Sequence, residues 1–93
     1  MADSGRKLSQ QVQVINDLGL HARSAAKIAA IARNATAGVW LSRNREKVDA
    51  RSIVDILTLA CEKGSDLTIG IDDYNDRNIL NRIVELVRSG FGE

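Results

Sequence analysis

Short stretches in which apolar and polar residues alternate are interleaved, along this chain, with stretches in which apolar residues recur every three to four positions. The first pattern predicts strands, and it covers residues 8–14, 38–42, 47–50 and 67–71. The second predicts helices, and it covers residues 22–33, 53–60 and 79–87. The order βαββαβα favours an α+β fold, an open-faced β-sandwich in which a four-stranded, mainly antiparallel sheet carries three helices on one face.

Turn and capping residues separate these segments. Asn16 to Gly19 is a turn signal before the first helix, and residues 43–46 predict the turn of a hairpin. Ser52, with Asp55 three residues later, predicts the start of the second helix, which we expect to end at Gly64.

The two faces of the predicted sheet differ in polarity. Val12 and Val14 fall on one face of the first strand and therefore predict the core. Gln11, Gln13 and Thr68 fall on the other face, which we expect to be open to solvent.

Composition limits the classes of function. The 93 residues carry a net charge of +1 and 3% aromatic residues, which disfavours nucleic-acid binding and a membrane surface. One cysteine, Cys61, excludes an internal disulfide and fits a reducing, cytoplasmic compartment; we expect it to pack in the core. One histidine and one cysteine make a metal centre improbable. We expect one domain over residues 7–93, preceded by a flexible head over residues 1–6.

The single histidine, His21, stands at the predicted start of the first helix. The backbone N–H groups of Ala22, Arg23 and Ser24 have no intrahelical acceptor there, and the positive end of the helix dipole favours an anion. Arg23 adds a full positive charge. An imidazole is largely neutral and nucleophilic near pH 7, so this arrangement can accept and hold a phosphoryl group. Taken from position alone, a lone histidine at a helix start is more often a solvated cap than a reactive group.

Three motifs together resemble one known family. GLHARSAAKIAAIA, residues 19–32, resembles the signature Gly-(Leu/Ile)-His-Ala-Arg-Pro-Ala of HPr, the histidine-containing phosphocarriers of the bacterial phosphoenolpyruvate-dependent sugar phosphotransferase system (PTS). Residues 50–53 resemble the family's regulatory-serine segment, and residues 62–69 resemble its Gly-x-Asp-(Val/Leu)-Thr-(Ile/Leu) strand. The three motifs occur in the family's order across about residues 8 to 90.

The resemblance implies a phosphocarrier rather than an enzyme with its own turnover. His21 would accept phosphate on Nδ1 from phosphorylated Enzyme I and pass it to an EIIA-type acceptor, and Arg23 would stabilise the phosphate. Ser52 would be the site of an HPr kinase/phosphorylase. The family implies no cofactor, and we expect a monomer.

Two positions depart from the family pattern. Ser24 replaces the family's proline, which restores a backbone N–H and adds a hydroxyl in the first helical turn. Asp55 replaces a glycine, and its carboxylate would repel a phosphate on Ser52.

A docking surface around the histidine should contain apolar residues. Leu20, Val54 and Leu57 are the candidates, together with Ile53. The helical spacing of Ile53 and Leu57 favours a core position for both, so Val54 is the strongest of the four.

Other functional classes fit less well or stay open. RNA-binding sheets share this order of elements but need clustered aromatics and a basic surface. A small-molecule enzyme would need an acid/base pair beside His21. The main alternative is a regulatory HPr-like partner of a kinase or a transcription factor, in which phosphorylation acts as a signal.

Overall fold

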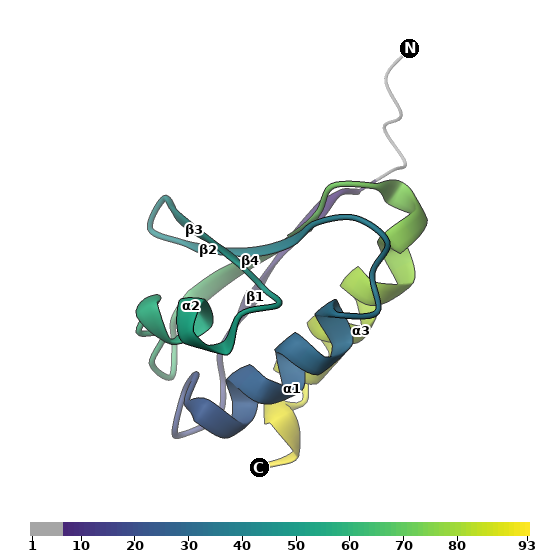
Figure 1. The fold of residues 1–93 in the computed structure, drawn as a ribbon. Coiled ribbons are helices and arrows are strands. Elements are labelled where there is room, and N and C mark those ends of the chain that lie inside the picture. Colours follow the sequence, from purple (N-terminus) through teal and green to yellow (C-terminus); the bar gives the residue numbers. More distant parts are fainter. Residues whose placement is uncertain (1–6) are drawn as a thin grey trace.

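A computed structural model describes residues 7–93, and in it four strands form one sheet in the order β1-β4-β2-β3 (Figure 1). All three strand pairs are antiparallel. The strands are β1 (Ser9–Gln13), β2 (Val39–Arg43), β3 (Glu46–Asp49) and β4 (Asp66–Ile71).

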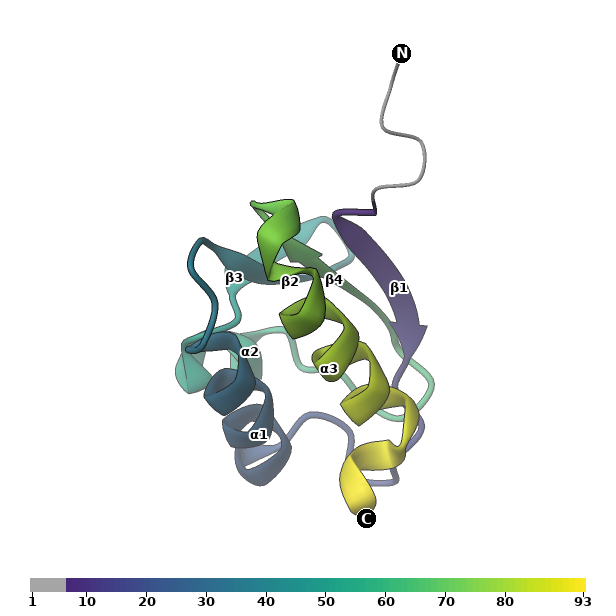
Figure 2. The same ribbon diagram turned by 90° about the vertical axis from the view of Figure 1, so that its right-hand side faces the viewer.

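The helices cover one face of this sheet and leave the other open (Figures 1 and 2). They are α1 (Ala22–Ala32), α2 (Ile53–Thr58) and α3 (Arg77–Arg88), and two short 3-10 helices, η1 (Tyr74–Asp76) and η2 (Gly90–Gly92), flank α3. The predicted fold class, element order and one-sided packing are confirmed.

The strand register separates a core face from a polar face. Val12 is opposite Leu67 and both are buried, whereas the neighbouring pair, Gln11 and Thr68, lies on the open face. On the same open face Trp40 is opposite Gly70, and a Cβ at Gly70 would lie 2.0 Å from the indole ring. The alternation read from the sequence therefore gives the correct sides for β1 and β4.

The predicted end of the second helix is wrong. Helix α2 ends at Thr58, with Leu59 as its C-cap, and Gly64 lies in the turn before β4. The guanidinium of Arg43 donates to the carbonyls of Leu59 (2.9 Å) and Ala60 (2.8 Å), so a side chain from β2 satisfies carbonyls at the end of the helix. This long-range cap replaces the glycine cap that the local sequence suggested.

Asp76 joins the start of α3 to the loop after α1, a link that sequence reasoning missed. Its buried carboxylate accepts hydrogen bonds from the backbone N–H of Thr36 (2.9 Å) and of Ala37 (2.9 Å) and from the Thr36 hydroxyl (3.1 Å). The two backbone donors hold the pKa of Asp76 below its usual value.

The flexible head over residues 1–6 lies outside the described residues. Within residues 7–93, none of the helices is both long enough and apolar enough to cross a bilayer.

Candidate functional site

His21 is the N-cap of α1, as the sequence predicts. Its backbone is extended (φ −118°, ψ −178°), and its side chain is 25% exposed. The first intrahelical bond runs from Ala25 N–H to the His21 carbonyl (2.8 Å), so the N–H groups of Ala22, Arg23 and Ser24 precede the helical ladder. The structure therefore places an accessible imidazole beside the amino end of an eleven-residue helix.

The backbone that leads into His21 is held on both sides. Gly19, at φ +63°, closes the turn by donating to the Asn16 carbonyl (3.1 Å). Leu20 N–H then donates to the Cys61 carbonyl (2.9 Å), which ties this loop to the segment after α2. Cys61 is buried, as predicted, and burial raises the pKa of its thiol. The position of the histidine is thus set by contacts from distant parts of the chain.

The Ser24 hydroxyl belongs to the helix cap. Its Oγ accepts from the His21 backbone N–H (2.9 Å) and can donate to the carbonyl of Gly19 (3.2 Å) or His21 (3.1 Å). The side chain is fully buried. For Ser24, the candidate phosphate donor is therefore the backbone N–H and not the hydroxyl. The hydroxyl instead fixes the first turn of the helix, as the family's proline would do.

Glu93 contacts the histidine, and sequence reasoning did not find it. Its Oε2 lies 2.6 Å from His21 Nε2, and its Oε1 accepts from Asn16 Nδ2 (3.1 Å). The hydrogen bonds from His21 and then from Asn16 lower the pKa of Glu93, and the positive charge of Arg23 contributes in the same direction. No local pattern indicates this contact, because 72 residues separate its two partners.

The segment that carries Glu93 packs against α1. Lys27 Nζ donates to the Phe91 carbonyl (2.7 Å), and the Phe91 side chain is 1% exposed. Both ribbon views place the yellow C-terminal segment beside α1 (Figures 1 and 2). This anchoring keeps the Glu93 carboxylate next to the imidazole.

Arg23 and Ser52 differ in their relation to the histidine. Arg23 is exposed in the first turn of α1, near enough to Glu93 to affect its pKa. Ser52 caps α2, and its Oγ accepts from Asp55 N–H (3.1 Å), as predicted. The guanidinium of Arg33 donates to the backbone carbonyl of Arg51, the residue before Ser52. Arg33 is the C-cap of α1, at the end of the helix opposite His21. The structure does not bring Ser52 into the histidine site.

The docking candidates divide by exposure. Leu20 is 7% exposed and belongs to the core, so its assignment to a docking surface is corrected. Val54 is 72% exposed and Leu57 is 38% exposed. Ile53 is partly buried against the core. Leu18, which sequence reasoning missed, is 64% exposed and lines a shallow pocket with Glu93. We define the candidate docking surface, called the docking surface below, as the exposed residues Leu18, Val54 and Leu57.

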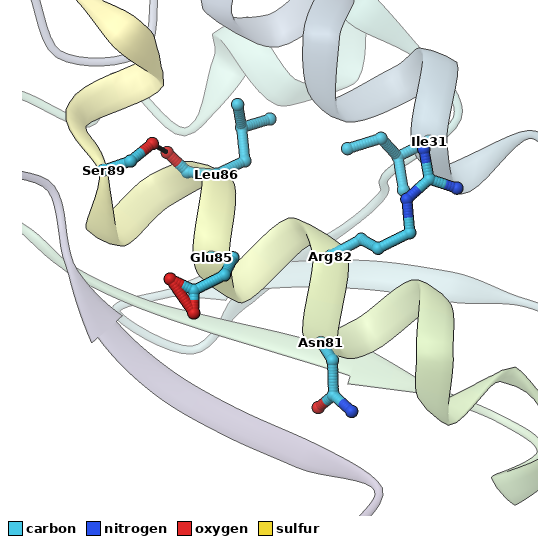
Figure 3. A pocket seen from close by; sticks show the side chains of 6 residues that line it. All are labelled: Ile31, Asn81, Arg82, Glu85, Leu86 and Ser89. Carbon is cyan, nitrogen blue, oxygen red and sulfur yellow. Dashed lines mark hydrogen bonds between the residues drawn. The ribbon is translucent and has the colours of Figure 1, made fainter.

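A separate groove runs between α1 and α3. Figure 3 shows its lining side chains, which come from α3 and its end except for Ile31 of α1; they are Ile31, Asn81, Arg82, Glu85, Leu86 and Ser89. None of the residues predicted for the site lines this groove.

Known proteins resemble this chain in sequence and in fold. A family model described as "PTS HPr component phosphorylation site" matches residues 8–89. The chain belongs to the HPr family of PTS phosphocarriers. The HPr of Cupriavidus necator is 37% identical to it over 86 residues, which are 92% of this chain and 97% of that protein.

Two further similarities extend the comparison. The crystal structure of an HPr from Thermoanaerobacter tengcongensis superposes with a TM-score of 0.87 at 28% identity, covering 94% of this chain and 98% of the other. The phosphoryl donor subunit DhaM of a phosphoenolpyruvate-dependent dihydroxyacetone kinase from Providencia stuartii is 31% identical over 90 residues, which are 97% of this chain and 19% of DhaM. A segment similar to this chain thus occurs both as a protein of about this length and as a small part of a longer one.

Proposed function

We propose that this HPr-family chain accepts a phosphoryl group on His21 from phosphorylated Enzyme I and passes it to an EIIA-type acceptor. The observation that carries the proposal is the partly exposed imidazole at the start of α1, inside the segment that matches the family's phosphorylation-site model. The chain acts as a carrier in the cytoplasm and needs no cofactor for the transfer.

The chemistry follows from the groups that surround the ring. A neutral ring nitrogen of His21 attacks phosphorus, a new N–P bond forms, and the bond to the donor's leaving nitrogen breaks with its electron pair returning to the donor. The backbone N–H groups of Ala22 and Ser24 and the guanidinium of Arg23 stabilise the negative oxygens of the phosphoryl group. The family's Nδ1 is the nitrogen that we assign to the new bond.

Partner contact excludes water while the phosphoryl group moves. The docking surface of Leu18, Val54 and Leu57 supplies apolar area for this purpose. The bond between Leu20 N–H and the Cys61 carbonyl places the segment after α2 next to the histidine loop, so one partner can cover both. Because Enzyme I and the acceptor use the same nitrogen in turn, they compete for this surface.

A second phosphorylation at Ser52, by an ATP-dependent HPr kinase/phosphorylase, is proposed on narrower grounds. Its Oγ already caps α2, and a phosphate there would meet the Asp55 N–H and the favourable end of the helix. The Asp55 carboxylate opposes it through charge repulsion. Treatment with such a kinase and ATP tests this step. An acid-stable phosphate that is lost in Ser52→Ala supports it, and the absence of any acid-stable phosphate on the parent contradicts it.

Loading with phosphoenolpyruvate and Enzyme I tests the main proposal. Intact mass should show one added phosphoryl group that is labile in acid and stable in alkali. His21→Ala should remove the modification, whereas Ser52→Ala should load like the parent. Phosphate on the His21→Ala variant, or an unmodified parent protein, would contradict the proposal.

A further inference from the structure

The open face of the sheet carries Trp40, the only tryptophan in the chain. Its indole lies over the backbone of β4, because a Cβ built at Gly70 would lie 2.0, 2.1 and 2.5 Å from three atoms of the six-membered ring. Gly70 is buried beneath it. One face of the ring therefore rests on the sheet, and the other is turned away from the helices, which cover the opposite side of the sheet (Figures 1 and 2).

A cavity of about 340 Å³ opens beside this indole, where β2 begins and β4 ends. Four charged side chains line it: Lys47 and Asp49 from β3, Arg51 just after β3, and Asp72 just after β4. Among the described residues, Trp40 is the only aromatic residue in the lining. The cavity, which we call the indole pocket, has the size of a small-molecule site.

The charges that line the indole pocket cancel. Asp49 and Asp72 supply two carboxylates, which accept hydrogen bonds, and Lys47 and Arg51 supply two cations, which donate them. An anionic ligand would be repelled by the carboxylates, and a cationic ligand would be repelled by the ammonium and the guanidinium. A neutral ligand meets neither repulsion. Hydroxyl groups suit this lining best, because each of them both donates and accepts.

Three of these side chains keep hydrogen-bonding capacity for a ligand. Arg51 donates through Nη2 to the carbonyls of Ala35 (3.0 Å) and Ala37 (2.6 Å), which fixes the guanidinium and leaves Nε and Nη1 without an acceptor among residues 7–93. Asp49 accepts from the Arg51 backbone N–H through Oδ1 (2.8 Å), so its Oδ2 is available. Asp72 is exposed, and its carboxylate accepts no hydrogen bond from the described part of the chain.

Lys47 lies over the free face of the indole. Its Nζ is 4.4 Å from the ring centroid of Trp40, and the side chain is exposed. A cation–π contact at an exposed site is weak, and the stem of a lysine is flexible. A ligand can therefore displace the ammonium from the ring, and the displaced ammonium remains at the rim of the pocket as a hydrogen-bond donor.

We propose that the indole pocket binds a neutral sugar ring, stacked through its C–H groups on the free face of Trp40. The flat apolar face of an indole suits such C–H groups. The hydroxyl groups of the sugar donate to Asp49 and Asp72 and accept from Arg51. The pocket lies on the sheet, whereas His21 stands at the start of α1 in the helical layer, so the inference does not depend on the proposed phosphoryl transfer.

Fluorescence of Trp40 tests the proposal, because no other tryptophan contributes to the emission. The full chain is titrated with D-glucose, N-acetyl-D-glucosamine and maltose at millimolar concentrations. At least one of these sugars should change the emission in a saturable way, since a stacked sugar replaces water at the ring. Glycerol has hydroxyl groups but no ring, and adenosine monophosphate can stack but is anionic, so neither should give a saturable change. No saturable response to any of the three sugars, or a stronger one to adenosine monophosphate, would overturn the proposal.

Two aspartate variants test the assigned contacts. Asp72→Ala should weaken the binding of the responding sugar roughly tenfold, the loss expected for one hydrogen bond to a charged group. Asp66→Ala removes an exposed carboxylate at the other end of β4 and is the matched control, which should bind like the parent. Equal affinities of the two variants would refute the role of Asp72.

NMR of the ¹⁵N-labelled chain gives the position of the ligand. Addition of the responding sugar should shift the indole N–H signal of Trp40 and the backbone signal of Asp72, and should leave the signals of His21 unchanged. Shifts centred on His21 would place the sugar elsewhere and overturn the assignment to the indole pocket.

Discussion

Gly19 is the position where a single methyl group should do the most damage to the histidine loop. Its φ of +63° belongs to the left-handed region, in which a residue with a Cβ is disfavoured by about 1 to 2 kcal/mol. A Cβ there would also lie 2.3 Å from the Cys61 carbonyl oxygen and 2.9 Å from Glu62 Cα. Both contacts are with backbone, so the loop must move to relieve them.

The size of the effect can be worked out from these contacts. Moving the loop breaks the hydrogen bond between Leu20 N–H and the Cys61 carbonyl, which costs about 1 kcal/mol of stability. The steric strain of the added methyl group costs about 1 to 3 kcal/mol more, the usual cost of overpacking. Together with the cost of the positive φ, Gly19→Ala should lower the free energy of unfolding by about 3 to 6 kcal/mol. This is a large part of the stability of a domain of this size.

Gly64→Ala is the matched control. Gly64 also has a positive φ (+93°), but a Cβ there would meet no atom within 4 Å, so only the conformational cost of about 1 to 2 kcal/mol applies. Thermal unfolding followed by circular dichroism should show a drop of about 4 to 16 °C for Gly64→Ala and a clearly larger one for Gly19→Ala. Equal decreases in melting temperature for the two variants would refute the claim that the Cys61 carbonyl leaves no room for a side chain at position 19.

Three further predictions follow from other parts of the structure. Ser24→Ala removes the acceptor for the His21 backbone N–H and should lower the free energy of unfolding by about 1 kcal/mol, measured by urea denaturation. Val54→Asp places a charge on a 72% exposed side chain, so stability should be unchanged while the KM of Enzyme I for this chain rises. Acid denaturation should depend on Asp76, because its folded pKa lies below the unfolded value: its stabilisation is complete above about pH 4 and is lost as pH falls through the lower folded pKa.

Each of these has a clear contrary result. Parent-like urea midpoints for Ser24→Ala would show that its hydroxyl is dispensable to the cap. An unchanged KM for Val54→Asp would remove Val54 from the docking surface. If Asp76→Asn loses stability on acidification as steeply as the parent between pH 4 and 2, the carboxylate is not the group that titrates.

The sequence predicts the fold well because its signals are local. Alternating residues such as Val12 and Gln11 assign the two faces of the sheet, and Ser52 marks the start of α2 through a bond to a residue three positions away. His21 at the start of α1 is equally local. Each of these features depends on neighbours within one turn or one strand.

The missing parts depend on contacts between distant residues. The side chain of Arg43, in β2, bonds carbonyls at the end of α2. The local sequence contains no sign of this contact, and Gly64 therefore predicted the end of the helix wrongly. Asp76 bonds a loop about 40 positions away, and Glu93 reaches His21 across 72 positions. No periodicity encodes such pairs. Leu20 is buried, and its backbone N–H bonds to Cys61, 41 positions away, so its place in the core likewise involves a distant segment.

The fate of a labelled phosphoryl group tests the central claim most directly. The chain is loaded with ³²P from phosphoenolpyruvate through Enzyme I, purified, and then incubated alone or with an EIIA domain. We predict that the label stays on the protein alone and moves to EIIA when the acceptor is present. Release as inorganic phosphate at the same rate with and without EIIA would contradict the account of His21 as a carrier.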